Sequence, residues 1–382
     1  MVYQADHLWT PVTNAAIAVH PGDACRGYGC QDASTTSLKH AGFSPSPLGA
    51  PPALIDTVRL SGAVFGLDGL DVLGRLRKSR QIIDLASGEV DDFPYWSIDG
   101  VAINTYKHGG LEHVIFEASL PKRRRGSNVQ LLPLRQGDDE VRKIYSWLGQ
   151  HVRWRCEPED LRVHRLDASL DFQGVTSLDY LIRGLAGIPV AWERTSPAIY
   201  ADPERGHAIT LARGSRTTDR ASLYSKAAEV NYRLRQAGSP DPASHPDAIA
   251  ARDVARFEAQ LRSPFLKTFG VAHWGEVTEE RITAMRRDSF EKRHFDRPVV
   301  SGLQLIKVMR EQGISPARQA GIFYDAVLLS LGEQPQGDRG TQAQRRRDLE
   351  NLRVAVGEPL QAAPRVWLDY QGQCQRSEAE SN

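Results

Sequence analysis

The sequence has few cysteines, no long apolar run and almost no net charge. Its four cysteines, at positions 25, 30, 156 and 374, are too few and too scattered for a disulfide framework or a zinc site. No apolar run approaches the ~20 residues that a membrane-spanning helix needs. The N-terminus lacks the basic-then-apolar pattern of a secretory signal. We therefore expect free thiols, a cytoplasmic location and no membrane partner.

A net charge of only +1, from 48 Lys and Arg against 47 Asp and Glu, does not by itself indicate a nucleic-acid binder. The positive charges are clustered, however, and three clusters are clear. One is the run Lys122, Arg123, Arg124 and Arg125, a second covers residues 345–347, and the third comprises Arg213, Arg216 and Arg220. Such runs are most often solvated surface. Because two of them lie near the candidate chemistry described below, they favour a groove that follows a phosphate backbone.

Hydrophobic periodicity divides the chain into four parts. Residues 1–52 are rich in Gly, Pro and Ser without a lasting period, which predicts a tail. Residues 53–270 mix strand and helix patterns and predict an α+β domain with an antiparallel sheet, whereas 271–365 predict only helices and 366–382 a second tail. The predicted strands cover 55–60, 95–106, 113–120, 162–172, 207–212, 221–225 and 253–261, and the predicted helices cover 67–76, 140–152, 177–185, 226–238, 279–285, 301–312, 316–331 and 342–356.

Three of the predicted strands have an apolar face and a polar face, and each polar face carries a carboxylate: Glu117, Asp167 and Glu258. Antiparallel sheets commonly have one solvent-exposed polar face, so each carboxylate taken alone is more often a surface or salt-bridge residue. If the three strands share one sheet, the carboxylates can converge. With His113 as a further candidate, such oxygen ligands suit Mg²⁺ or Mn²⁺. Arginines on these faces would hold phosphates or pair with the carboxylates.

Tyr224 lies two residues before Lys226, where a period-2 segment gives way to a helical one. Taken alone, this is more often a half-buried tyrosine that ends a strand. Beside the carboxylate-bearing strands, a tyrosine nucleophile that attacks a phosphodiester becomes a serious alternative. A phenol ionises near pH ~10, so a nearby cation such as Lys226 would favour the phenolate. Tyr232 fits a helix surface or core better.

Several segments, taken in order, resemble the rolling-circle replication initiators of filamentous phages, the gene II/gene X type. Glu117-Ala118-Ser119-Leu120-Pro121-Lys122, followed by Gly126 and Asn128, is similar to a motif of that family, as is Arg165-Leu166-Asp167-Ala168. Leu223-Tyr224-Ser225-Lys226 with Glu229 is similar to its nicking segment. The remaining matches are Ile55-Asp56-Thr57-Val58, Arg256-Phe257-Glu258-Ala259 and Phe265-Leu266-Lys267-Thr268-Phe269-Gly270.

The resemblance implies a nuclease fold that uses one tyrosine and a divalent metal. It implies nicking of one strand of a double-stranded phage origin, in the cytoplasm of a bacterial host, and closure of the displaced single strand into a circle. Host helicase and polymerase would be partners. Tyr224 and Lys226 would be catalytic, and Glu117, Asp167 and Glu258 would bind Mg²⁺ or Mn²⁺. The candidate DNA-binding residues are Lys122, Arg123, Arg124, Arg125, Arg165, Arg213 and Arg256.

Two other functions fit parts of the sequence. The first is a DNA-binding replication regulator on the same fold that no longer cleaves, against which Tyr224, Lys226 and the three acidic strands argue. The second is a plasmid mobilisation relaxase, against which the lack of a histidine cluster and of a helicase-sized extension argues.

Overall fold

The computed structural model describes residues 52–67, 70, 77–83, 90–188, 197–201, 208–215, 217–330, 340, 344, 347–348, 351–356 and 365–378. Within these residues the protein is α+β and contains a large antiparallel sheet of eleven strands. Its strands follow the order β2-β3-β4-β5-β1-β7-β11-β10-β9-β8, with β6 paired to β1. The strands are β1 Leu54–Val64, β2 Arg77–Ile83, β3 Val90–Ile98, β4 Val101–His108, β5 Leu111–Ser119, β6 Leu132–Pro133, β7 Arg162–Phe172, β8 Ala198–Ala201, β9 Ala208–Gly214, β10 Asp219–Ser225 and β11 Ala255–Arg262.

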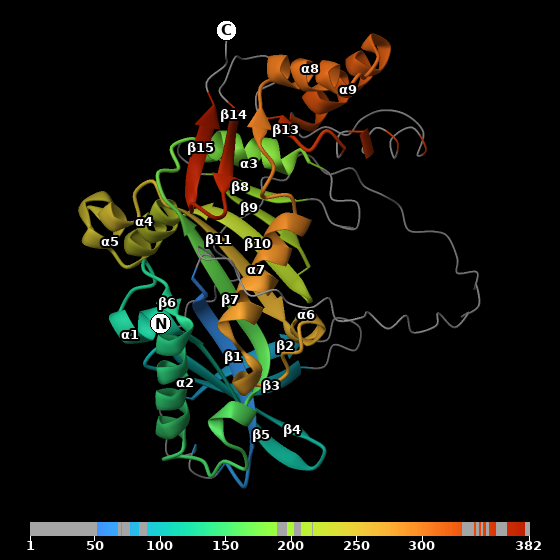
Figure 1. Cartoon of the computed structure of the whole chain (residues 1–382). Helices are drawn as coiled ribbons and strands as arrows, with labels where there is room; N and C mark the ends of the chain where they lie inside the picture. Colours follow the sequence, from blue (N-terminus) through green and yellow to red (C-terminus); the bar gives the residue numbers. More distant parts are fainter. Residues whose placement is uncertain are drawn as a thin grey trace, which may run out of the picture.

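Nine α-helices accompany the strands in the described residues. Figure 1 shows α7 lying across the centre of the large sheet, with α8 and α9 at the upper end of the molecule. The helices are α1 Leu120–Arg125, α2 Leu134–Leu148, α3 Leu178–Ala186, α4 Lys226–Gln236, α5 Pro246–Ala250, α6 Ser263–Thr268, α7 Glu279–Lys292, α8 Gly302–Glu311 and α9 Pro316–Ser330. None of the helices in the described part of the chain is long and apolar enough to cross a membrane.

The core lies against one face of the sheet and follows from strand alternation. On β7 the residues at even positions, from Leu166 to Phe172, are fully buried. Helix α7 packs on this face, where the Phe290 ring lies 5.8 Å from that of Phe172 and 5.1 Å from that of Phe257. Helix α2 approaches β1 closely because Gly137 has no side chain: a Cβ there would lie 2.2 Å from Ile55. The opposite face of the sheet is left for polar side chains.

The C-terminal part differs from the helix-only prediction. Strands β12 Val299–Val300, β13 Ala355–Val356, β14 Arg365–Asp369 and β15 Cys374–Glu378 form a second sheet of four strands, in order β13-β12-β14-β15. Two of these strands have two residues each, which is too short to give a period-2 signal. Apart from its first residue, Arg365, the hairpin β14–β15 lies in the range predicted as a tail. Helix α7, predicted for a separate helical domain, shares the core of the large sheet. All but the last residue of the predicted tail at 1–52 and most of the predicted helix at 67–76 lie outside the described residues.

Arg286 connects α7 to the large sheet and provides a test of this packing. Its buried guanidinium donates to the carbonyl oxygens of Pro52 and Ser169, both through Nη1, and to the Tyr370 hydroxyl. Arg286→Met should lower the free energy of unfolding by about 3 kcal/mol or more, because hydrogen bonds to a charged group contribute about 1.5–3 kcal/mol each. Urea unfolding followed by circular dichroism measures the change.

The neighbouring Arg287 is the matched control. It lies on the same helix, is exposed and pairs only at the surface with Glu291. Arg287→Met should change the free energy of unfolding by no more than about 0.5 kcal/mol. Equal effects of the two substitutions would show that the contacts of Arg286 do not stabilise the fold.

Candidate functional site

The register of the sheet brings the predicted polar strand faces together. Strands β5, β1, β7, β11 and β10 are consecutive neighbours, and opposed residues share a face. Arg59 on β1 is opposed to Glu117 on one side and to Arg165 on the other, and Asp167 is opposed to Gln260. Across β11 and β10, the opposed pairs are Arg256 with Tyr224 and Glu258 with Ser222. Every residue named here therefore lies on the face opposite the core, which we call the polar face.

Glu117 and Asp167 are joined by one arginine. Arg165 Nη1 donates to Glu117 Oε1 at 2.8 Å, while its Nε donates to Asp167 Oδ1 at 2.8 Å. Arg59 lies 3.9 Å from the second oxygen of Glu117. These contacts give Glu117 two cationic partners. Arg165 Nη2 also donates to Asp167 Oδ2 at 2.5 Å, so a metal ion at Glu117 or at Asp167 would have to displace an arginine.

Asp56 is a site residue that the sequence analysis did not single out. It lies in a bulge of β1, between Ile55 and Val58, and is only 3% exposed. Its carboxylate accepts hydrogen bonds from Ser119 Oγ at 2.7 Å and Asn128 Nδ2 at 3.4 Å. The available signal was the one carboxylate in the sequence of β1, in a segment that resembles part of the initiator family. A bulge commonly re-aims a side chain toward a site, which a strict period-2 analysis misses.

Three carboxylates of the polar face influence one another. The pKa of Asp167 is raised to about 7, because burial and the charges of Glu258 and Asp56 outweigh the lowering effect of Arg165. Burial also raises the pKa of Glu258, and the charge of Asp56 adds to that increase. Since negative charges here oppose one another, the site favours a proton or an added cation.

The donors present have the chemistry of a Mg²⁺ or Mn²⁺ site, but they are not gathered as one. Ser169 lies between Asp167 and Asp171 on β7, and its fully buried hydroxyl has no hydrogen-bond partner among the described residues. Carboxylate and hydroxyl oxygens are the donors that hard divalent ions take. In the described part of the chain, no three His, Cys, Asp or Glu side chains are arranged so that they could hold a metal ion. The three predicted metal ligands thus share a face without forming a ready coordination shell.

Tyr224 points its hydroxyl at a carboxylate rather than at the predicted lysine. The hydroxyl donates to Glu258 Oε2 at 3.2 Å. Burial raises the pKa of Tyr224 above its usual value and the charge of Glu258 adds to this, while the Arg256 guanidinium lowers it. Tyr224 is therefore a neutral phenol at physiological pH. An attack by its oxygen requires that the proton pass to a base, and Glu258 is in contact with it.

Lys226, the nearby cation expected to favour the Tyr224 phenolate, donates its hydrogen bonds to Glu229 and Asn128 rather than to Tyr224. The strand ends at Ser225, whose side chain accepts a hydrogen bond from the Ala228 amide and so begins α4. Lys226 is turned into the interior, where its Nζ donates to Glu229 Oε2 at 2.7 Å and Asn128 Oδ1 at 3.2 Å. Burial and the charge of Arg256 lower the pKa of Lys226.

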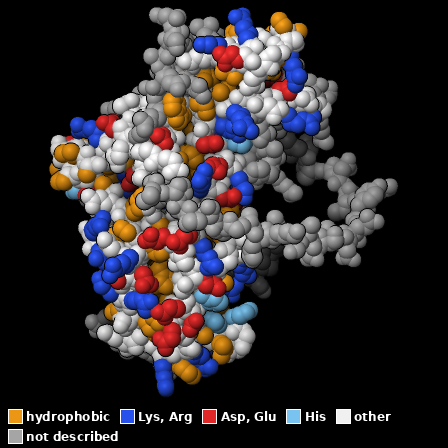
Figure 2. Space-filling model, viewed as in Figure 1, with side chains coloured by type: hydrophobic (Ala, Val, Ile, Leu, Met, Phe, Trp, Pro, Cys, Tyr) orange, Lys and Arg blue, Asp and Glu red, His pale blue; other side chains and the backbone are white. Residues whose placement is uncertain are grey.

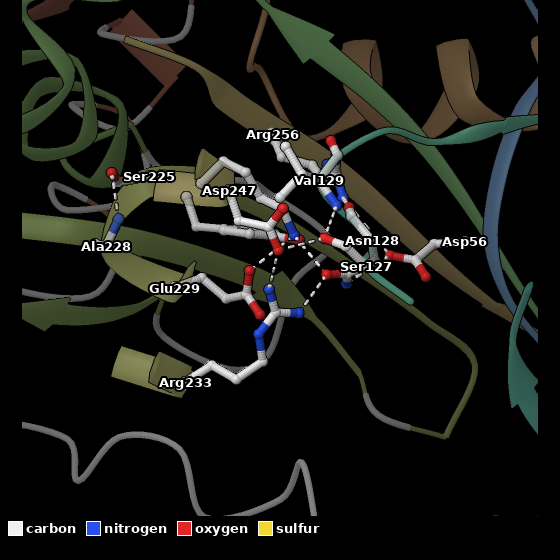
Figure 3. A network of polar contacts seen from close by, with 12 residues as sticks. Asp56, Ser127, Asn128, Val129, Ser225, Ala228, Glu229, Arg233, Asp247 and Arg256 are labelled. Atoms are coloured by element: carbon white, nitrogen blue, oxygen red, sulfur yellow. Dashed lines mark hydrogen bonds and ion pairs between the residues drawn. The ribbon is translucent and has the colours of Figure 1, made fainter. Parts of the chain in front are cut away.

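Asn128 is the centre of the network that Figure 3 shows. Its side-chain oxygen accepts from Lys226 and, at 2.9 Å, from Arg233 Nη1. Arg256 donates to the carbonyl oxygens of Asn128 and Val129, both at 2.7 Å. This network attaches the loop 126–131 to the ends of β10 and β11. The loop that resembles part of a family motif is thus fixed beside Tyr224.

Two predicted DNA-binding arginines are buried. Arg256 is fully buried and forms a bidentate pair with Asp171, at 2.6 and 2.9 Å. Arg213 is 2% exposed and donates to the carbonyl oxygens of Leu185, Ile188 and Arg293. Their acceptors come from the protein itself, so neither guanidinium lies at a surface that a phosphate backbone could contact. Arg165 is partly exposed on the polar face.

The basic run Lys122, Arg123, Arg124 and Arg125 forms most of α1, at the end of β5. Arg124 Nη1 lies 3.3 Å from buried Glu140 of α2, and Arg125 donates to Gln130 and Gln136. Figure 2 shows basic side chains over this region interleaved with acidic ones. Lys122 and Arg125 are exposed, so the run can still contact an anion, although part of its charge is balanced internally.

Comparison with known proteins adds little. No family model and no curated protein matches the chain. One solved structure, that of DynU16, a protein from the dynemicin biosynthetic locus, covers 62% of this chain and 95% of its own at 12% identity, with a TM-score of 0.14. A TM-score of this size carries no argument about fold or function.

A thermal shift assay tests whether the carboxylates bind a divalent ion. Mn²⁺ or Mg²⁺ should raise the melting temperature of the native protein, because an ion that binds only the folded state stabilises it by mass action. Asp167→Asn combined with Glu258→Gln should remove the metal-dependent increase. The control Glu291→Gln, on exposed α7 surface, should retain it. If the metal raises the melting temperature of the native protein, the double variant and Glu291→Gln equally, the ion binds at another site.

Proposed function

We propose that this chain is a DNA nicking and joining enzyme of the rolling-circle initiator type, with Tyr224 as its nucleophile. The observation that carries the proposal is the contact of the Tyr224 hydroxyl with Glu258, on the same sheet face as Asp56 and Asp167. The segments that resemble the initiator family lie far apart in the sequence. Asp56, Arg256 and Glu258, from two of the other segments, nevertheless lie close enough to influence the pKa of Tyr224, which supports a shared catalytic role.

In the proposed reaction the Tyr224 oxygen attacks the scissile phosphorus. Its proton passes to Glu258, whose raised pKa makes it a better base than an ordinary carboxylate. The bond from phosphorus to the 3′ oxygen breaks, and that oxygen leaves as a 3′-hydroxyl after it takes up a proton. The product is a 5′-phosphotyrosine. Because this ester retains the phosphodiester bond energy, a 3′-hydroxyl can later attack it and reseal the strand.

A Mg²⁺ or Mn²⁺ ion held by Asp167, Glu258 and Asp56 would neutralise the scissile phosphate. The remaining roles belong to the chain itself. Arg256 counters the rise in the pKa of Tyr224 that burial causes, and Lys226 holds Asn128 in place. Exposed residues of α1, with Lys122 and Arg125 foremost, would contact the backbone of the origin duplex, and Arg165 would contact DNA on the polar face. The replication partners and the host cytoplasm remain those that the resemblance implies.

The non-cleaving regulator is the second candidate. It is favoured by one observation, namely that Tyr224 is a neutral phenol and Lys226 makes no direct contact with it. A regulator would use the same basic surfaces to bind DNA without attacking it. The experiment on Tyr224 separates the two functions.

Tyr224→Phe should abolish nicking of supercoiled origin DNA and formation of the covalent protein–DNA adduct, while origin affinity stays within about twofold. Phenylalanine keeps the ring and removes the attacking oxygen. Nicking is measured by conversion to open circles, and the adduct by its retained label on a denaturing gel. Tyr232→Phe, in the adjoining helix α4, should cleave normally. If Tyr224→Phe nicks DNA at the native rate, Tyr224 is not the nucleophile. If the native protein does not nick DNA, the result favours the non-cleaving regulator.

The pH dependence of nicking tests the role of Glu258. A base acts only when deprotonated, so activity should rise with pH through the pKa of Glu258, which lies above the usual glutamate value. The acidic limb should therefore appear at a higher pH than for an unperturbed glutamate. Glu258→Gln should reduce the single-turnover rate by about 10²–10⁴-fold and eliminate this limb. A variant that keeps the same limb would show that another group titrates.

A further inference from the structure

The C-terminal end of β1 carries an exposed aromatic ring in contact with two guanidinium groups. Phe65 is 57% exposed, and the guanidinium carbons of Arg155 and Arg153 lie 4.2 and 5.0 Å from its ring centroid. The main chain fixes this arrangement, since the Phe65 amide donates to the Arg153 carbonyl at 2.9 Å. Arg155 Nε also donates to the Val64 carbonyl at 3.0 Å. The result is a positively charged aromatic surface.

A second group of rings lies beside it on the β4–β5 hairpin. The rings of Tyr106 and His113 are stacked with centroids 4.7 Å apart, and His108 lies at their edge at 6.4 Å. Register opposes His113 to Tyr106 and to Ala63, which is two residues before Phe65. Figure 1 shows the β4–β5 hairpin at the lower end of the molecule. We call Phe65, Arg153, Arg155, Tyr106 and His113 the end patch.

The end patch continues the polar face that carries Tyr224. Strand alternation on β1 places Arg59, Ser61 and Ala63 on that face. Phe65 directly follows the last strand residue, Val64, and its ring contacts Arg153 and Arg155. Ser61 Oγ and His164 Nε2 form a hydrogen bond of 2.7 Å, so the polar face between Arg59 and the end patch also carries polar groups. Between β10 and β4 lie five strand spacings of about 4.8 Å, or about 24 Å across the sheet. One extended nucleic-acid strand could therefore follow the face from one site to the other.

We propose that the end patch is a subsite for single-stranded DNA, at which unpaired bases stack while the strand extends toward Tyr224. The inference rests on the proposed function. Bases stack on aromatic rings and on guanidinium planes, and both are present. Stacking faces are available only when bases are unpaired, so this patch selects single strands over duplex. The nearby acidic residue Glu112 is paired with Lys107 at 3.5 Å, which leaves the arginine charge to attract phosphates.

The test measures binding without cleavage. The full chain with Tyr224→Phe is the parent, and the probe is a fluorescent oligothymidylate of about 16 nucleotides, within the range that one single-strand-binding fold covers. Adding Phe65→Ala should weaken binding about 5- to 100-fold, the range expected for loss of one stacked base. Phe65→Trp should retain the affinity. Arg155→Ala should flatten the log–log salt dependence by about 0.7, the value for one phosphate on a single strand.

Tyr324→Ala is the matched control, because Tyr324 is 54% exposed on α9, far along the chain from the patch. It should bind as the parent does. The inference is overturned if the parent does not bind the oligonucleotide, if Phe65→Ala binds as tightly as the parent, or if a duplex of equal length is bound as well and is weakened equally. The binding assay needs no cleavage, so it can be interpreted even if the native protein does not nick DNA. If the native protein nicks DNA but Phe65→Ala does not change binding, only the end-patch proposal is wrong.

Discussion

The candidate site depends on the buried guanidinium of Arg256. A fully buried charge is tolerated only when it is paired and hydrogen-bonded, and Arg256 has both the Asp171 carboxylate and two main-chain carbonyls as acceptors. The carbonyls belong to Asn128 and Val129, so the same contacts that satisfy the charge also fix the loop 126–131. Asn128 then offers its side-chain oxygen to Lys226 and Arg233. The start of α4, and with it the end of the strand that carries Tyr224, is thereby attached to a loop almost one hundred residues earlier.

The fold could be predicted from sequence where periodicity is long and strict. The strand predicted at 162–172 has the same bounds as β7, because polar and apolar side chains alternate from Arg165 to Phe172. The segment predicted as one strand at 95–106 is instead parts of β3 and β4, divided at Asp99 and Gly100. Both residues have positive φ, 48° and 76°, as a tight hairpin turn requires. The Asp-Gly signal was present in the sequence, but apolar residues on both sides concealed it.

The candidate site was only partly predictable because its decisive contacts are non-local. Carboxylates at strand positions 117, 167 and 258 follow from alternation, and so does their common face. The bulge that turns Asp56 into the site, and the acceptors that hold Arg213 in the interior, depend on segments distant in the chain. The position of Lys226 was also not predicted, although here the cause is local in the sequence. Its two-residue spacing from Tyr224 gives a shared face only if the strand continues, but the Ser225 cap begins a helix there and turns the lysine inward.

The charge balance of the polar face constrains any reaction that occurs on it. Asp56, Asp167 and Glu258 already oppose one another, and the arginines beside them are engaged with acceptors of the protein. A phosphodiester brings a further negative charge to this face. Its arrival must therefore be accompanied by positive charge, either as protons on the raised-pKa carboxylates or as a divalent ion between them. Protonation of Glu258 would remove the base that Tyr224 needs, whereas a divalent ion would keep Glu258 deprotonated, with Oε2 still in contact with the phenol. For a nicking enzyme, the second route is the one compatible with attack by a neutral phenol.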